Sequence, residues 1–266
     1  MPKTSRGGRR GSGGGNATVP NTPAKANTPS GVSYAQFMQM PDSQKYDTIN
    51  NIINDRNIQV PSYLDNSETS KVLYGLGMNN KPAVVSDAQL DTMQGRELFR
   101  TVYERGTMPP PASGDVIDQI RTGDYTQMSG AGGSAHGRAI YFATSFNDSK
   151  SYGTHENNPR IMRAKINPTA NVRSQTSLVN QMSNDATWNA SKVGSRGNHP
   201  YANKDNIALY ALSHGVDAWY SGSYTMVVNR GALTASDQTR HITKRATNGL
   251  VRLGTANSWS EGAIAK

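Results

Sequence analysis

Apolar residues recur at helical spacing three times in the first third of the chain, each time after a residue type that caps helices well. In the first of these segments Tyr46, Ile49 and Ile53 fall on one helix face. The three expected helices begin near Asp42, Ser67 and Ser86. Together they predict a helical annex over residues 33–94.

Beyond residue 95 the pattern changes to short apolar or alternating runs, which predict strands mixed with helices. In one run Arg163 and Lys165 alternate with apolar residues and should face away from them. Strands are expected over 98–103, 139–143, 161–166, 217–220 and 225–228, and helices after Ser113 and over 206–214. Because the regular alternation of a doubly wound sheet is missing, an α+β core is predicted over 95–238.

The first 32 residues are built from Gly, Ser, Pro, Asn, Thr and basic residues, without apolar periodicity. Such a segment cannot offset the entropy of ordering, so we expect a disordered tail over 1–32. Five basic residues and no acid lie there, against a net charge of +9 for the whole chain: Lys3, Arg6, Arg9, Arg10 and Lys25. A basic arm suits DNA or an acidic protein surface, and a solubilising tail is the alternative. Residues 239–266 form a second basic segment.

Composition excludes several classes of site. The chain has no cysteine, which excludes disulfides, thiolate zinc sites and cysteine nucleophiles. The five histidines are scattered without the spacing of metal ligands, so no metal site is expected. No apolar run approaches the ~18 residues needed to cross a bilayer. The N-terminus lacks the apolar region of a secretory signal, so we expect neither membrane association nor export by that route.

The candidate functional residues lie in three segments of the expected core, at 97–100, at 137–152 and at 224–229. The middle segment holds Tyr-Phe-Ala from Tyr141, and a second tyrosine, Tyr152, follows eleven residues after the first. Over roughly residues 95–235 this order resembles the ADP-ribosyltransferase superfamily. The tyrosine pair is similar to the poly-ADP-ribose polymerase branch, whereas Arg100 is similar to the arginine-containing, toxin-like branch. The resemblance implies a split, mixed or antiparallel β core that uses NAD as substrate.

The resemblance also implies roles for single residues. Arg100 would hold a phosphate or ribose oxygen with its rigid fork of donors. Tyr141 and Tyr152 would sandwich the nicotinamide ring, and Gly137 would let the backbone approach the carboxamide. The cofactor-binding residues are thus expected to be Arg100, Gly137, Tyr141, Ser145 and Tyr152, and the catalytic residues Tyr141 and Tyr224.

One position departs from the family pattern. In that family the catalytic glutamate normally begins the last strand, where this chain has Ser223 or Tyr224, and none of the five glutamates of this chain lies in the residues just before Val227. Asp217 is the nearest upstream acid. A tyrosine hydroxyl is neutral at pH 7, so it cannot supply the negative charge that stabilises an oxocarbenium-like state.

Two functions therefore remain open. The first is an NAD-dependent mono-ADP-ribosyltransferase, or an NAD glycohydrolase, that acts on a protein or nucleic-acid acceptor. The second is a catalytically silent structural protein that contacts DNA through the basic tail. Residues 207–219 and 226–233 are similar to ADP-ribosyltransferase-like domains attached to phage head and virion proteins. That similarity implies a place in a phage virion or in the host cytoplasm.

Overall fold

The computed structural model describes residues 28–61, 67–78, 81–102, 136–151, 160–193, 204–241, 244–247, 250–253 and 264–265. Its helices are α1 (Tyr34–Met38), α2 (Asp42–Asn54), α3 (Glu68–Gly75), α4 (Asp87–Thr92), α6 (Phe146–Ser151), α7 (Gln175–Asn184), α8 (Ala186–Ser191), α9 (Lys204–Ser213) and the 3-10 turn η2 (Arg230–Ala232). Its strands are β1 (Ala83–Val85), β2 (Arg96–Val102), β3 (Ile140–Ala143), β4 (Arg160–Ile166), β5 (Val172–Ser174), β6 (Ala218–Ser221), β7 (Tyr224–Val227), β8 (Leu233–His241), β9 (Lys244–Thr247), β10 (Leu250–Leu253) and β11 (Ile264–Ala265). The predicted α+β class is confirmed.

The main sheet is mixed, as expected, with the order β1-β8-β4-β2-β3-β7-β6-β5 and with β11 added beside β8. The pairs β1–β8 and β5–β6 are parallel, and the other pairs are antiparallel. Strands β2 and β3 share a single register pair, Phe99 with Ala143, whereas β2 pairs with β4 along its whole length. We call β1-β8-β4-β2 the first half-sheet and β3-β7-β6-β5 the second half-sheet. The two half-sheets meet at the β2–β3 junction, which has fewer paired residues than any other strand pair of the main sheet.

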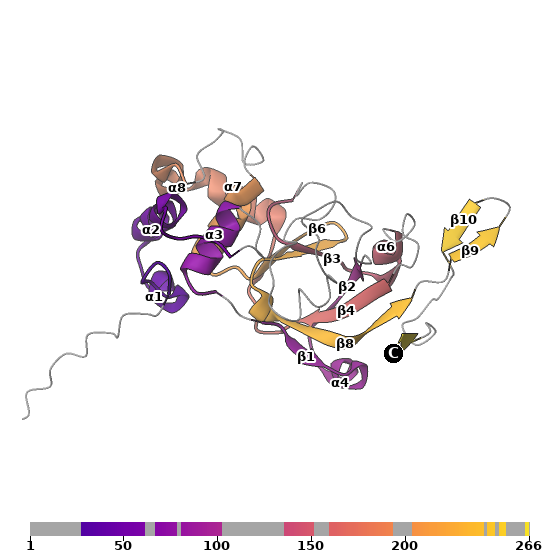
Figure 1. Cartoon of the computed structure of the whole chain (residues 1–266). Helices are drawn as coiled ribbons and strands as arrows, with labels where there is room; N and C mark the ends of the chain where they lie inside the picture. Colours follow the sequence, from indigo (N-terminus) through magenta and orange to yellow (C-terminus); the bar gives the residue numbers. More distant parts are fainter. Residues whose placement is uncertain are drawn as a thin grey trace, which may run out of the picture.

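The N-terminal helices belong to the same core as the sheet. Helices α1, α2, α3, α7 and α8 gather at one end of the molecule (Figure 1). Tyr46 and Ile49 of α2 are buried as expected, but the third buried apolar residue of that face is Ile52, and Ile53 is only partly buried. The range 33–94 also supplies strand β1, which pairs with β8.

Local signals in the sequence place several helix ends correctly. Ser67 accepts a hydrogen bond from Ser70 N and caps α3, and Ser86 with Gln89 forms the expected capping box of α4. Helix α9 ends before Gly215, whose φ of +65° is a conformation that glycine tolerates best. The helix expected after Ser113 lies outside the described residues.

Order begins before residue 33. Residues 28–32 form a turn in which Ser30 N and Oγ both donate to the carbonyl of Gly75, at 3.1 and 2.6 Å. These bonds attach the turn to the end of α3. Residues 1–27, which hold the basic residues of the expected tail, lie outside the described part.

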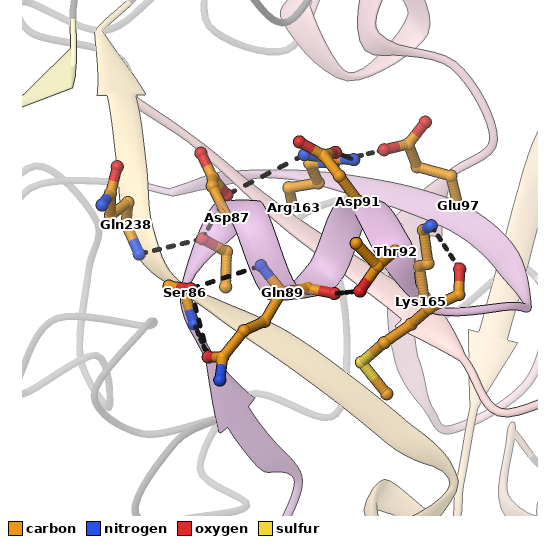
Figure 2. A network of polar contacts seen from close by, with 11 residues as sticks. Ser86, Asp87, Gln89, Asp91, Thr92, Glu97, Arg163, Lys165 and Gln238 are labelled. Atoms are coloured by element: carbon orange, nitrogen blue, oxygen red, sulfur yellow. Dashed lines mark hydrogen bonds and ion pairs between the residues drawn. The ribbon is translucent and has the colours of Figure 1, made fainter.

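A polar network around Arg163 ties α4 to three strands (Figure 2). Arg163 faces away from its apolar neighbours on β4, as the alternation predicts, yet it is buried rather than solvated. Its guanidinium bonds Asp91 of α4 and Glu97 of β2 and lies 4.0 Å from Asp87, which accepts from Ser236 of β8. Burial alone would lower the pKa of Arg163, but the two carboxylates raise it, so the cation persists.

Among the described residues, no helix combines the length and the apolar character needed to cross a membrane.

Candidate functional site

Arg100 and Tyr141 meet across the junction of the two half-sheets. Arg100 on β2 is 7% exposed, and its Nη1 donates to the backbone carbonyl of Tyr141 on β3. These two residues were expected to share a site, and the contact does bring them together. It involves the guanidinium and the Tyr141 backbone, however, whereas the Tyr141 ring has other partners. The bond fixes the orientation of the planar guanidinium at the junction.

The side chain of Tyr141 bonds back to the chain that enters β3. Its hydroxyl donates to the carbonyl of Gly137 at 2.7 Å and accepts from His136 N at 3.1 Å. Burial raises the pKa of Tyr141 to about 12, although the amide of His136 and the charge of Arg138 act in the opposite direction. The phenol therefore stays protonated at neutral pH. It can donate or accept a hydrogen bond, but it cannot act as a base.

Gly137 occupies a position that other residues would strain. Its φ is +103°, and a Cβ there would lie 3.0 Å from Trp219 Cζ2 and 3.2 Å from Ile207 Cβ. Trp219 Nε1 also donates to the carbonyl of His136 at 2.8 Å. The glycine was expected to let the backbone approach a ligand. What the structure shows is a close approach of the backbone to β6 and α9.

His136 is a candidate that sequence reasoning missed. Its Nδ1 lies 2.8 Å from Gln175 Oε1, and its ring stacks on Tyr224 with centroids 5.9 Å apart and planes inclined by 28°. The Tyr141 ring lies 6.4 Å away, tilted by 45°. Histidine spacing along the chain pointed to no metal site and so set this residue aside. The available signal was its place directly before Gly137, in the segment that carries the resemblance.

Tyr224 begins β7, at the position where the resemblance implies a glutamate. It pairs with Ala143 and is partly buried, and the neighbouring Ser223 carbonyl accepts from Thr144 N at 2.9 Å. His136, Tyr141 and Tyr224 thus form one aromatic group at the β3–β7 pair, which we call the His136 cluster.

Asp217, the nearest acid upstream of Tyr224, has its carboxylate engaged near the far end of β7. It accepts from Asn171 N at 2.8 Å and from Asn229 Nδ2 at 2.6 Å, and its carbonyl accepts from Val228 N. Val228 follows the far end of β7, four residues beyond Tyr224, which corresponds to about 13 Å of strand.

Of the two remaining cofactor candidates, the structure describes only Ser145. Ser145 caps α6, because its hydroxyl donates to Asp148 Oδ2 at 2.6 Å and accepts from Asp148 N at 3.0 Å. Tyr152 lies outside the described residues, so its place beside Tyr141 stays a prediction.

A separate hollow of about 700 Å³ runs along the polar face of α7 and contains none of the expected site residues. Its walls are Ser174, Thr176, Ser177, Asn180, Gln181, Asn184, Asp185 and Tyr210. Within the described ranges, no three His, Cys, Asp or Glu side chains are grouped so as to hold a metal ion.

Thr225, next to the cluster on β7, is fully buried, and its hydroxyl has no hydrogen-bond partner among the described residues. We expect Thr225→Val to raise the free energy of unfolding by about 1 kcal/mol, because valine fills the same space without an unpaired hydroxyl. Thr101→Val is the matched control, since the Thr101 hydroxyl is also buried but bonds Ser149. That variant should lose about 1 kcal/mol in urea unfolding. A loss of stability in Thr225→Val would contradict this reading of β7.

Comparison of the chain with family models, curated proteins and solved structures finds no match.

Proposed function

We propose that this protein is an NAD-dependent mono-ADP-ribosyltransferase that binds NAD at the junction of the two half-sheets. The observation that supports the proposal best is the contact of Arg100 with the Tyr141 backbone. It joins an arginine suited to phosphate or ribose oxygens with the strand that carries the family-like Tyr-Phe-Ala motif. The His136 cluster adds flat aromatic surface on the adjoining β3–β7 pair, of the kind that a nicotinamide ring packs against.

The arrangement favours slow, single transfers. Breaking the bond between nicotinamide and ribose develops positive charge, which a carboxylate stabilises best. Tyr224 offers only a hydroxyl at the expected acid position, and Asp217 is engaged at the other end of β7. An acid of the protein or nucleic-acid acceptor would then have to supply the missing charge.

A second candidate is favoured by the lack of an acid at Tyr224 and by the engagement of Asp217. It is a catalytically silent protein that keeps the fold as a structural or DNA-contacting part of a phage virion. In that case the basic residues of 1–27 would bind DNA phosphates. Affinity would then fall by roughly 0.9 log unit per log unit of salt for each phosphate neutralised.

Binding of NAD tests the first candidate directly. We expect wild-type protein to bind NAD in titration calorimetry and Arg100→Lys to bind about tenfold to hundredfold more weakly. The reason is that lysine loses the planar fork and a charge-assisted hydrogen bond. Arg163→Lys is the matched control, because Arg163 is another buried arginine of the same sheet that lies among carboxylates. Equal affinities for all three proteins would argue against a role of Arg100 in binding.

A further inference from the structure

His136 is held by four other elements of the structure, although it ends a glycine-rich stretch of sequence. Its amide donates to the Tyr141 hydroxyl, and its carbonyl accepts from Trp219 Nε1. Its ring bonds Gln175 of α7 and stacks on Tyr224 of β7. Backbone and ring are therefore both fixed, as a binding group that is ready before its ligand arrives would be.

The bond to Gln175 decides which ring nitrogen carries the hydrogen. An amide oxygen can only accept, so Nδ1 donates to Gln175 Oε1 and Nε2 of the neutral ring keeps its lone pair. Gln175 is 6% exposed and is the first residue of α7, so burial holds it in place. No residue in the described ranges bonds Nε2, and the His136 side chain is only partly buried. Nε2 is thus an oriented acceptor for a hydroxyl.

We infer that His136 Nε2 accepts a hydrogen bond from a hydroxyl of the nicotinamide ribose. This inference rests on the proposed NAD binding and names a residue for one part of that ligand. His136 lies on the ring of Tyr224, and in the proposed function the nicotinamide packs against this cluster, so the ribose attached to the nicotinamide is the part of NAD that comes nearest to Nε2. A neutral nitrogen replaces the acceptor but not the negative charge of a carboxylate. His136 therefore supports ribose binding without restoring the stabilisation of the transition state.

The test compares NAD with two analogues that lack either the 2′- or the 3′-hydroxyl of the nicotinamide ribose. Calorimetry of wild-type protein should show about threefold to tenfold weaker binding of one analogue, the effect of one neutral hydrogen bond. His136→Phe keeps an aromatic ring on Tyr224 but has no acceptor, so it should bind NAD and that analogue equally. NAD lacking the 2′-hydroxyl of the adenosine ribose is the control ligand, and its relative affinity should not respond to residue 136.

Each outcome decides the matter. If His136→Phe binds the analogue more weakly than NAD by the same factor as wild type, the inference about His136 is overturned, whereas the proposed NAD binding stands. If folded wild-type protein binds no NAD, the proposed function itself fails. Should His136→Phe not melt cooperatively, His136→Gln takes its place, because its amide oxygen can still accept. That variant should keep most of the discrimination, and complete loss of it in folded protein would contradict the assigned hydrogen bond.

Discussion

We expect Gly137→Ala to lower the free energy of unfolding by about 3 kcal/mol, of which backbone strain and overpacking each supply a part. The backbone at Gly137 has a φ of +103°, which residues with a Cβ rarely adopt. The added methyl group would also press on Trp219 Cζ2 and Ile207 Cβ, at 3.0 and 3.2 Å. Because both neighbours are buried in the core, neither can move away freely.

Gly222→Ala separates the two causes. Gly222 also has a positive φ, +57°, but a Cβ there meets no atom within 4 Å. Chemical denaturation should therefore show a loss of about 1 kcal/mol for this control, from backbone strain alone. Equal losses in the two variants would mean that the packing of β6 and α9 on Gly137 contributes nothing.

The second large effect is expected for Asp185→Ala, which should lose roughly 2 to 3 kcal/mol. Asp185 Oδ1 accepts from Trp188 N at 2.8 Å and caps α8, and Oδ2 accepts from the Tyr46 hydroxyl at 2.5 Å. The Tyr46 side chain is fully buried. Alanine removes the cap and takes from the buried phenol its bond to Asp185. Asp185→Asn keeps an oxygen acceptor and should lose only about 1 kcal/mol at neutral pH.

The same carboxylate makes stability depend on pH. Burial alone would raise the pKa of Asp185, but the hydrogen bonds from Tyr46 and Trp188 outweigh burial and lower it. A carboxyl whose pKa is lower in the folded state stabilises the fold above its unfolded pKa of about 3.9, and this contribution is lost as pH falls through the folded pKa. The stability gap between wild type and Asp185→Asn should be constant from about pH 5 to 8 and shrink in more acidic buffer. A gap that persists unchanged at pH 2 would contradict this assignment.

What the sequence predicts well is local. Ser86 and Gln89 are three residues apart, and their capping box follows from the pattern alone. Helices α7 and α8 escaped prediction because their sequences are rich in Gln, Ser and Asn, and only a few apolar residues mark a buried face. Their caps, Ser174 and Asp185, are ordinary loop residues until the helix that follows is known.

Contacts between distant residues could not be foreseen. Arg163 and Asp91 are 72 positions apart, and Tyr46 and Asp185 are 139 apart. Alternation shows that Arg163 faces away from the apolar side of β4, but not that α4 covers it there. His136 and Gln175, 39 positions apart, meet only because α7 follows β5 at the edge of the second half-sheet. The family resemblance pointed to Arg100 and Tyr141 at the β2–β3 junction. It did not point to His136, which lies between β2 and β3 in the sequence.

The charge at the start of β7 tests the central claim most directly. Nicotinamide release from NAD is measured for wild type, Ser223→Glu, Tyr224→Glu and the uncharged control Tyr224→Gln. If NAD binds beside the His136 cluster, wild type should release nicotinamide slowly but above background. One glutamate variant should then be at least about tenfold faster, because a carboxylate stabilises the developing positive charge, and Tyr224→Gln should not gain. Absence of NAD binding in wild type, together with no release by either glutamate variant, would contradict the account and leave the structural candidate.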